Sequence, residues 1–334
     1  MGNIYLGFIG TYTKKKSDGI YRILFDSEYG KFLEVSLAYN IENPTYLSLS
    51  KDNKTLFSIH GNNSEGGLCS FNINNLNLEK LHCISDSTKP PCFISNSNNY
   101  LFTSNYHEGI VNVYSLINDF DFNLIKTLNT TLKDSSKMHF SALSPNNKLL
   151  ATCNLSLDKI SMYKSDDFTK LYSITLTNNS GPRHIEFHSK LNIIYVLTEI
   201  TAEIFTIEYD DWGFNIIDVL SLYDDSPIQF EGAAIHMHPS NKFVYVSERK
   251  KNCITCCSIL KDGTLKLESQ FFLSNFNPRD FNFTPDGEWL IVASLLDDKL
   301  SSYKVDTSTG KIHYTSDEII VPEPTCVIFN KNIS

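Results

Sequence analysis

Short apolar stretches alternate with polar residues along almost the whole chain, and polar turns separate them. Apolar residues rarely recur at the helical spacing over the window of about eleven residues that a helix would need. A period of two is typical of half-buried β-strands, and Ile4–Ile9 and Gly19–Phe25 both follow it. The pattern therefore predicts an all-β protein.

The strand pattern repeats along the chain. Each unit opens with a short loop that contains Pro or a similarly placed residue, and three strands follow with polar turns between them. Turns rich in Pro, Asp, Asn and Gly recur after the first strand, as in Ser144–Lys148 and Thr284–Glu288. In the third unit we align His139 with the prolines of five other units and with Gly232 of the sixth. The units start about 40–50 residues apart, which is the period of a four-stranded propeller blade. They begin at Asn43-Pro44, Pro90-Pro91, Met138-His139, Gly181-Pro182, Glu231-Gly232, Asn277-Pro278 and Glu323-Pro324.

The last unit has only its first strand, Pro324–Phe329. The N-terminal segment has three strands that correspond to the second, third and fourth strands of a blade. One blade is therefore assembled from both ends of the chain, which removes the exposed edges that an open stack of sheets would leave. We predict that residues 1–334 form a single domain with the fold of a seven-bladed β-propeller. Its ring is closed by pairing of the C-terminal strand with the N-terminal blade.

The formal net charge of −9 argues against partners that require a basic face, so we expect no binding to nucleic acid or membrane. Lys14, Lys15 and Lys16 precede a turn signal, and we interpret them as a solvated loop. A small anionic ligand is compatible with the negative charge, because a few Arg residues can dominate one cleft. We expect a monomer or a weak homo-oligomer.

The N-terminus leads straight into a strand without the features of a signal peptide. No apolar run approaches the roughly 18 residues of a transmembrane helix. We therefore expect a cytoplasmic protein whose eight Cys residues are free thiols. Cys253 and Cys256 are spaced like zinc ligands but lack a second pair, so they predict no metal site.

In a propeller, the loop before the first strand of a blade and the loop between its second and third strands lie on the same face. These loops surround the channel, where ligands bind in such folds. Three arginines on this face favour an anionic ligand, because planar guanidinium groups bind carboxylate or phosphate with two hydrogen bonds. A Glu among them could instead form an ion pair that only lines the channel. The residues that we expect at this mouth are His139, Arg183, His184, Glu199, Arg249 and Arg279.

At these residues the chain resembles the bacterial seven-bladed propeller lactonases of the 6-phosphogluconolactonase type and their relative, the fungal carboxy-muconate lactonizing enzyme. The resemblance covers essentially the whole chain, and its most specific motif is Gly181-Pro182-Arg183-His184 followed by a strand and Glu199. The other segments that carry it are Gly10-Thr11-Tyr12-Thr13, Asn43-Pro44, Ser104-Asn105-Tyr106, His139 before Pro145, Tyr245-Val246-Ser247 with Arg249, and Asn277-Pro278-Arg279.

The resemblance implies a hydrolase that opens a sugar-acid lactone, with 6-phosphogluconolactone as substrate and a place in the pentose phosphate pathway. It implies no metal and no other cofactor. His139, titrating near neutrality, would act as base, and Arg183 and Arg249 would hold the oxyanion. The implied catalytic residues are His139, Arg183, Glu199 and Arg249, and those expected to bind the substrate are Asn105, Tyr106, His184 and Arg279.

Three segments depart from the family pattern and leave the substrate open. Asn154-Leu155-Ser156 replaces the usual Asp-Leu-Gly, and Ala233-Ala234-Ile235 replaces Ala-Glu-Ile, with Glu231 displaced by three positions. Ser247-Glu248-Arg249-Lys250 replaces Ser-Asn-Arg-Gly. A related enzyme acting on another lactone or on a muconate-type diacid is therefore an alternative. A non-catalytic binding platform is another, since fold does not determine function, although no Trp-Asp repeat is present.

Overall fold

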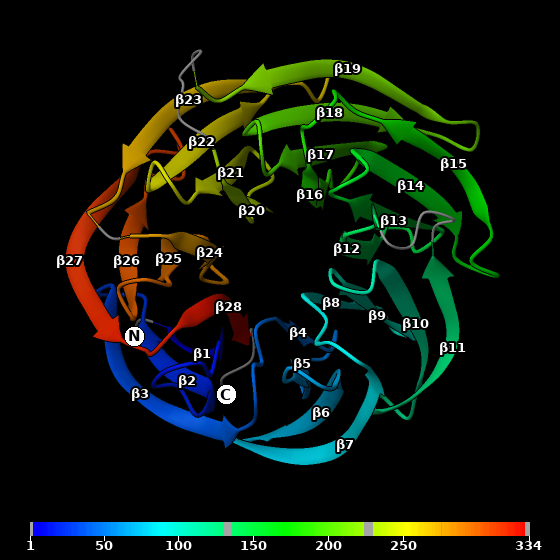
Figure 1. Cartoon of the computed structure of the whole chain (residues 1–334). Coiled ribbons are helices and arrows are strands. Elements are labelled where there is room, and N and C mark those ends of the chain that lie inside the picture. The colour runs from blue at the N-terminus through cyan, green and yellow to red at the C-terminus, as the bar shows by residue number, and fades with distance from the viewer. Residues whose placement is uncertain (1–2, 130–134, 224–229, 275, 331–334) are drawn as a thin grey trace.

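The chain forms a ring of β-sheets around a central axis (Figure 1). The computed structural model describes residues 3–129, 135–223, 230–274 and 276–330. Within these ranges the sheets number seven, each with four antiparallel strands. The same ranges contain no helix with the length and apolar character needed to cross a membrane.

Each blade runs from an inner strand to an outer one, and we number the blades from the one that holds the N-terminus. Blade 1 consists of β28 (Pro324–Asn330), β1 (Ile4–Thr11), β2 (Gly19–Asp26) and β3 (Lys31–Asn40); blade 2 of β4 (Leu47–Leu49), β5 (Thr55–Gly61), β6 (Gly66–Asn74) and β7 (Asn77–Ser87); blade 3 of β8 (Phe93–Asn96), β9 (Tyr100–Asn105), β10 (Ile110–Ile117) and β11 (Asp121–Asn129). Blade 4 consists of β12 (Met138–Leu143), β13 (Leu149–Asn154), β14 (Lys159–Lys164) and β15 (Lys170–Thr175); blade 5 of β16 (Pro182–Phe187), β17 (Ile193–Thr198), β18 (Glu203–Tyr209) and β19 (Phe214–Ser221). Blade 6 consists of β20 (Gly232–Met237), β21 (Phe243–Glu248), β22 (Cys253–Ile259) and β23 (Leu265–Phe272); blade 7 of β24 (Pro278–Phe283), β25 (Trp289–Ser294), β26 (Lys299–Val305) and β27 (Ile312–Ile320).

The predicted seven-bladed propeller and its closure are confirmed. β28 pairs antiparallel with β1, in a register that sets Ile328 opposite Phe8. Figure 1 shows this red C-terminal strand beside the blue N-terminal strands. The last strand of the chain is therefore the innermost strand of the first blade.

The alignment of the third repeat unit was wrong by one residue. Met138 pairs with Asn154 as Pro182 pairs with Thr198, so Met138 and not His139 occupies the proline position. The pairing then shifts register between Met138 and Phe140, which leaves His139 in a β-bulge. A bulge adds a residue to one strand only, so a count of residues along the repeat cannot locate it.

The apolar core lies between neighbouring blades, because each sheet has two faces to bury. Between blades 1 and 7, Ile9 and Phe25 pack with Trp289 and Phe329. The indole N–H of Trp289 donates a hydrogen bond of 2.8 Å to the carbonyl of Ser27. Each blade is thus stabilised by its two neighbours, and the ring by its closure.

The repeated turn after the inner strand has one backbone conformation in four blades. Asn53, Asn147, Asn241 and Gly287 occupy the same turn position, with φ between 57° and 74°. Asn and Gly tolerate this left-handed region better than other residues do. These residues explain why the turn signal recurs with the period of the blades.

The expectation that all cysteines are free thiols is wrong for two of the eight. Cys69 on β6 and Cys83 on β7 are directly opposite each other in an antiparallel pair and form a disulfide. The two residues are 14 apart in sequence, and only the register of the hairpin brings them together.

We expect Phe329→Ala to lower the free energy of unfolding by about 3 kcal/mol, because it leaves a cavity where the ring closes. Phe329 is 6% exposed, and its ring contacts Tyr5 edge-on at 6.5 Å. Urea unfolding followed by tryptophan fluorescence measures the change. Phe272→Ala is the matched control, since Phe272 is 60% exposed, and it should change the value by no more than about 0.5 kcal/mol. Equal losses in both variants would contradict the role of Phe329 in closure.

Candidate active site

β-Bulges on the inner strands direct polar side chains toward the axis of the ring. The register shifts between Pro182 and His184 in blade 5 and between Pro278 and Asp280 in blade 7, as it does in blade 4. Bulges of this kind re-aim a side chain beside a functional site. In each blade one residue directly follows the proline position. Six of these seven residues line one cavity: Thr45, Cys92, His139, Arg183, Arg279 and Thr325. The seventh is Ala233, whose carbonyl accepts a hydrogen bond from Nη1 of Arg183.

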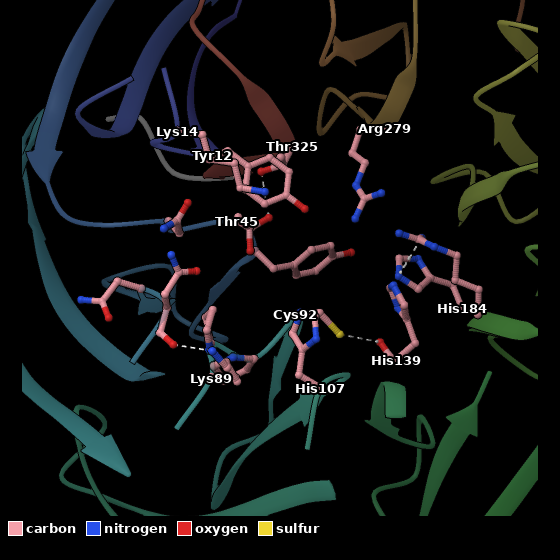
Figure 2. A pocket seen from close by; sticks show the side chains of 17 residues that line it. Tyr12, Lys14, Thr45, Lys89, Cys92, His107, His139, His184, Arg279 and Thr325 are labelled. Carbon is pink, nitrogen blue, oxygen red and sulfur yellow. Dashed lines mark hydrogen bonds between the residues drawn. The ribbon is translucent and has the colours of Figure 1, made fainter. Parts of the chain in front are cut away.

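The cavity has a volume of about 390 Å³, which suits a small molecule. Figure 2 shows His139, His184 and Arg279 pointing toward the same space, with Tyr12 and Lys89 across from them. Its wall carries aromatic, amide and cationic groups, and the described lining contains no carboxylate. The cavity therefore suits an anion with polar substituents.

Arg183 is held in a fixed orientation by three groups. Its Nε donates to Glu199 Oε2 at 2.9 Å, and Nη1 lies 3.2 Å from His184 Nε2. Since a guanidinium only donates, His184 Nε2 accepts, and the imidazole is neutral with its proton on Nδ1. Burial, and then the charge of Arg279, lowers the pKa of Arg183 to about 10. Among the described residues, Nη2 of Arg183 has no hydrogen-bond partner and is available to a ligand.

Glu199 and Arg249 lie behind Arg183 and do not line the cavity. Nη2 of Arg249 lies 3.3 Å from Glu199 Oε2, the oxygen that also binds Arg183. Nη1 of Arg249 lies 3.7 Å from Glu231 Oε2, and Lys250 Nζ lies 3.4 Å from the other oxygen of Glu231. The predicted Arg–Glu–Arg set is thus an ion-pair network that orients Arg183, and Glu231 is a member that sequence reasoning did not assign.

Arg279 differs from the other two arginines because no described residue forms an ion pair or hydrogen bond with its side chain. It is half-buried on β24 and lines the cavity, where Figure 2 shows it directed inward. Glu199 and Glu231 offset the charges of Arg183 and Arg249. The charge of Arg279 is therefore left for a ligand to neutralise.

His139 is neutral at physiological pH. Burial, followed by the charges of Arg183 and Arg279, holds its pKa well below the ordinary value of 6.5. The expectation that it titrates near neutrality is therefore wrong, and the cause is the desolvated, cationic setting. Its ring packs against those of His184 at 5.1 Å and Tyr106 at 6.1 Å. A neutral imidazole has a lone pair that can accept a proton from water, and the neighbouring guanidinium groups make it a weaker base than a free imidazole.

Two of the residues expected to bind substrate lie outside the lining of the cavity. Asn105 is buried, and its side chain bonds the carbonyl of Lys89 at 2.8 Å and the backbone N–H groups of His107 and Glu108. These bonds commit Asn105 to shaping the loop, away from the cavity wall. Tyr106 flanks His139 and holds Lys137 over its ring at 5.0 Å.

Asn154 is also committed to backbone structure. Its amide nitrogen donates to Ser136 Oγ at 2.7 Å, and its oxygen accepts the N–H groups of Lys137 and Leu157. It is 3% exposed and does not line the cavity. The departure from the family pattern at this position therefore leaves the cavity wall unchanged.

Several lining residues escaped sequence reasoning. Thr325 directly follows Pro324, and Tyr46 lies two residues after Pro44, as Arg183 and His184 follow Pro182. A comparison of these two positions in all seven units would have found both. Lys14 was taken for part of a solvated loop, but it lines the cavity with its Nζ 4.2 Å from the ring centre of Tyr12. Lys89 follows the outer strand β7, and no local signal marks it as part of the mouth.

Among the described residues, one group of His, Cys, Asp or Glu side chains lies close enough together to hold a metal ion. It consists of His60, Cys69 and Cys83 in blade 2, outside this cavity. The chemistry available at the cavity is that of guanidinium, ammonium, imidazole and phenol groups.

Comparison with known proteins agrees with this geometry. Residues 6–329 match the family described as Lactonase, 7-bladed beta-propeller. The chain is 30% identical over 343 residues to the 6-phosphogluconolactonase of Bacillus subtilis, covering 97% of this chain and 98% of that protein. It is 32% identical to an uncharacterised protein of Staphylococcus epidermidis, with 97% and 99% covered. A crystal structure of a Lactobacillus plantarum protein superposes with a TM-score of 0.91 at 27% identity, with 98% and 99% covered.

We expect Glu199→Gln to lower the free energy of unfolding by about 2 kcal/mol, because it leaves two buried guanidinium groups without their shared counter-charge. The loss should be smaller than for a fully buried pair, since the Glu199 side chain is 26% exposed. Glu288→Gln, which breaks an exposed pair with Lys304, is the control and should cost less than about 1 kcal/mol. Urea unfolding compares the two, and an equal cost would mean that the network does not stabilise the site.

Proposed function

The chain belongs to the family of seven-bladed β-propeller lactonases, and from this premise we propose that it hydrolyses a phosphorylated sugar-acid lactone. The substrate we propose is 6-phosphogluconolactone, which water opens to 6-phosphogluconate. The observation that carries the proposal is the unpaired guanidinium of Arg279 in a small cavity that also holds Arg183 and His139. A cytoplasmic location and a role in the pentose phosphate pathway stay predictions.

Lactone hydrolysis needs an activated water, a site for the developing oxyanion and a proton for the ring oxygen that leaves. His139, neutral because of its buried and cationic surroundings, takes a proton from the attacking water. Nη2 of Arg183 then faces the carbonyl oxygen as negative charge develops on it. When the ring C–O bond breaks, the leaving oxygen takes up the proton that His139 removed.

Arg249 and Glu199 have positioning roles in this scheme. Glu199 fixes Nε of Arg183 at 2.9 Å, and Arg249 in turn holds Glu199. A guanidinium that is fixed before the reaction need not reorganise as the oxyanion forms, which is the main advantage of a preorganised site. This assignment differs from the role that the family resemblance implied, in which Arg249 itself would hold the oxyanion.

The cations at the mouth favour phosphate as the anionic substituent. Lys14 and Lys89 line the same cavity as Arg279 and bring further positive charge to it. Nζ of Lys89 donates to the carbonyl of Asn63, which fixes the ammonium group near the mouth. A phosphate near neutral pH carries more charge than a carboxylate, so three cations match it better. A carboxylated lactone remains the second candidate, because Arg279 alone would bind either group.

The test is the hydrolysis of freshly prepared 6-phosphogluconolactone by purified protein, without added metal and above the spontaneous rate. We expect clear acceleration. Arg279→Gln should raise KM for this substrate about tenfold and change KM for unphosphorylated gluconolactone little, since one charge-assisted contact is lost. Lys15→Gln is the matched control, because Lys15 is an exposed cation near the mouth that does not line the cavity.

A folded protein without acceleration would exclude 6-phosphogluconolactone as the substrate. Equal loss on both lactones in Arg279→Gln would exclude Arg279 as the phosphate anchor and leave the reaction class intact. Acceleration of a carboxylated lactone instead, with the same dependence on Arg279, would favour the second candidate.

The decline of kcat/KM at low pH measures the pKa of the catalytic base. His139 acts when neutral, and its pKa is held down by burial and by Arg183, Arg279 and Arg249. We therefore expect kcat/KM to stay constant as the pH falls through 6.5 and to decline only at lower pH. Removing a cation makes protonation easier, so Arg279→Gln should move the decline to higher pH. A decline at or above pH 6.5 that Arg279→Gln does not move would exclude His139 as the base.

A further inference from the structure

A second chemical cluster lies in blade 2, outside the cavity. Cys69 on β6 and Cys83 on β7 form the disulfide, and His60 of β5 reaches them across the sheet. Nε2 of His60 lies 3.5 Å from the Sγ of Cys83 and 3.0 Å from the carbonyl oxygen of Ile84. A nitrogen ligand and two sulfur atoms therefore meet at one point on the blade.

Gly67 makes this contact possible. The register sets His60 opposite Gly67, and Gly67 lies opposite Ser85 on the next strand. A Cβ at Gly67 would lie 1.9 Å from the carbonyl oxygen of Ile84, so no other residue fits there without a shift of the backbone. The imidazole of His60 extends over this gap to the outer strand, two strands from its own backbone.

The two sulfur atoms differ in access. Cys83 is exposed on the outer strand, whereas Cys69 is fully buried in the core between blades 1 and 2. An external thiol can reach Cys83 and not Cys69. The six other cysteines are buried except Cys92, which is half-buried. This disulfide therefore includes the most accessible sulfur of the described cysteines.

The hydrogen bond of His60 distinguishes two uses of the cluster. A carbonyl oxygen only accepts, so the contact with Ile84 requires a hydrogen on Nε2. That N–H also faces Cys83, where it can stabilise a thiolate. A metal ion would need the lone pair of the same nitrogen and would break the bond to Ile84. The geometry thus favours thiol chemistry over metal binding.

We propose that Cys69, Cys83 and His60 form a thiol–disulfide exchange site whose reductant is a dithiol. One thiolate of the dithiol attacks the Sγ of Cys83, the S–S bond breaks, and the sulfur of Cys69 leaves with the bonding pair and takes up a proton. The second thiolate attacks its partner sulfur in the mixed disulfide and releases Cys83 as a thiolate beside His60. The dithiol loses two electrons and two protons: one proton goes to Cys69, and the other goes to solvent or to the Cys83 thiolate. The proposal does not depend on the lactonase reaction.

The test uses the full chain in its folded state. Protein purified in air is treated with dithiothreitol, the thiols are alkylated with N-ethylmaleimide at neutral pH, and modified cysteines are identified by peptide mass spectrometry. We expect Cys69 and Cys83 to be released together without unfolding, and Cys83 to be alkylated first. His60→Leu should slow alkylation of Cys83 about tenfold, because Leu has no hydrogen-bond donor for the thiolate. His82→Leu is the matched control and should leave the rate unchanged, since His82 faces Phe122 and Asp121 on the other side of β7.

Three results would overturn the proposal. The first is protein in which both cysteines react before reduction and do not pair when an oxidised dithiol is added. The second is a disulfide that dithiothreitol opens only after urea has unfolded the chain. The third is reduced protein that retains one equivalent of zinc and loses it in His60→Leu, because the cluster would then be a metal site.

Discussion

Closure of the ring is the constraint on which the other features depend. Every blade has two apolar faces, and each can be buried only against the next blade, so a stack of seven sheets is complete only when the last meets the first. β28 satisfies this condition by pairing with β1 inside the first blade. The same pairing brings Thr325 to the axis beside the residues that hold the equivalent place in the other blades.

Closure also explains how a chain with a net charge of −9 presents a cationic cavity. The inner strands contribute equivalent bulged positions to one axis, and three of these carry His139, Arg183 and Arg279. Two carboxylates behind Arg183 offset part of the charge, which fixes that side chain and leaves Arg279 unneutralised. The burial that closure imposes keeps His139 neutral. The orientation of Arg183, the unneutralised charge of Arg279 and the neutral state of His139 thus follow from one arrangement of strands.

The sequence predicted the cavity better than it predicted roles within it. His139, Arg183, His184 and Arg279 could be placed at one mouth, because loop position within the repeat determines the face of the ring. The ion pair of Arg249 with Glu231 could not be seen, since it joins the loop after β21 to the loop before β20. The backbone role of Asn105 was hidden for the same reason, because its partners include Lys89 in the loop between β7 and β8.

By itself the sequence determined the all-β class, the number of blades and the use of both termini in one of them, because strand alternation and turn residues are local and repeat with a fixed period. Only the tertiary structure decided which of these residues touch. Bulges shift register without leaving a mark on residue spacing, so the re-aiming of His139 was invisible along the chain. The pairing of Cys69 with Cys83 required the register of one hairpin. The protonation of His139 required the desolvation and the neighbouring charges that only a closed ring provides.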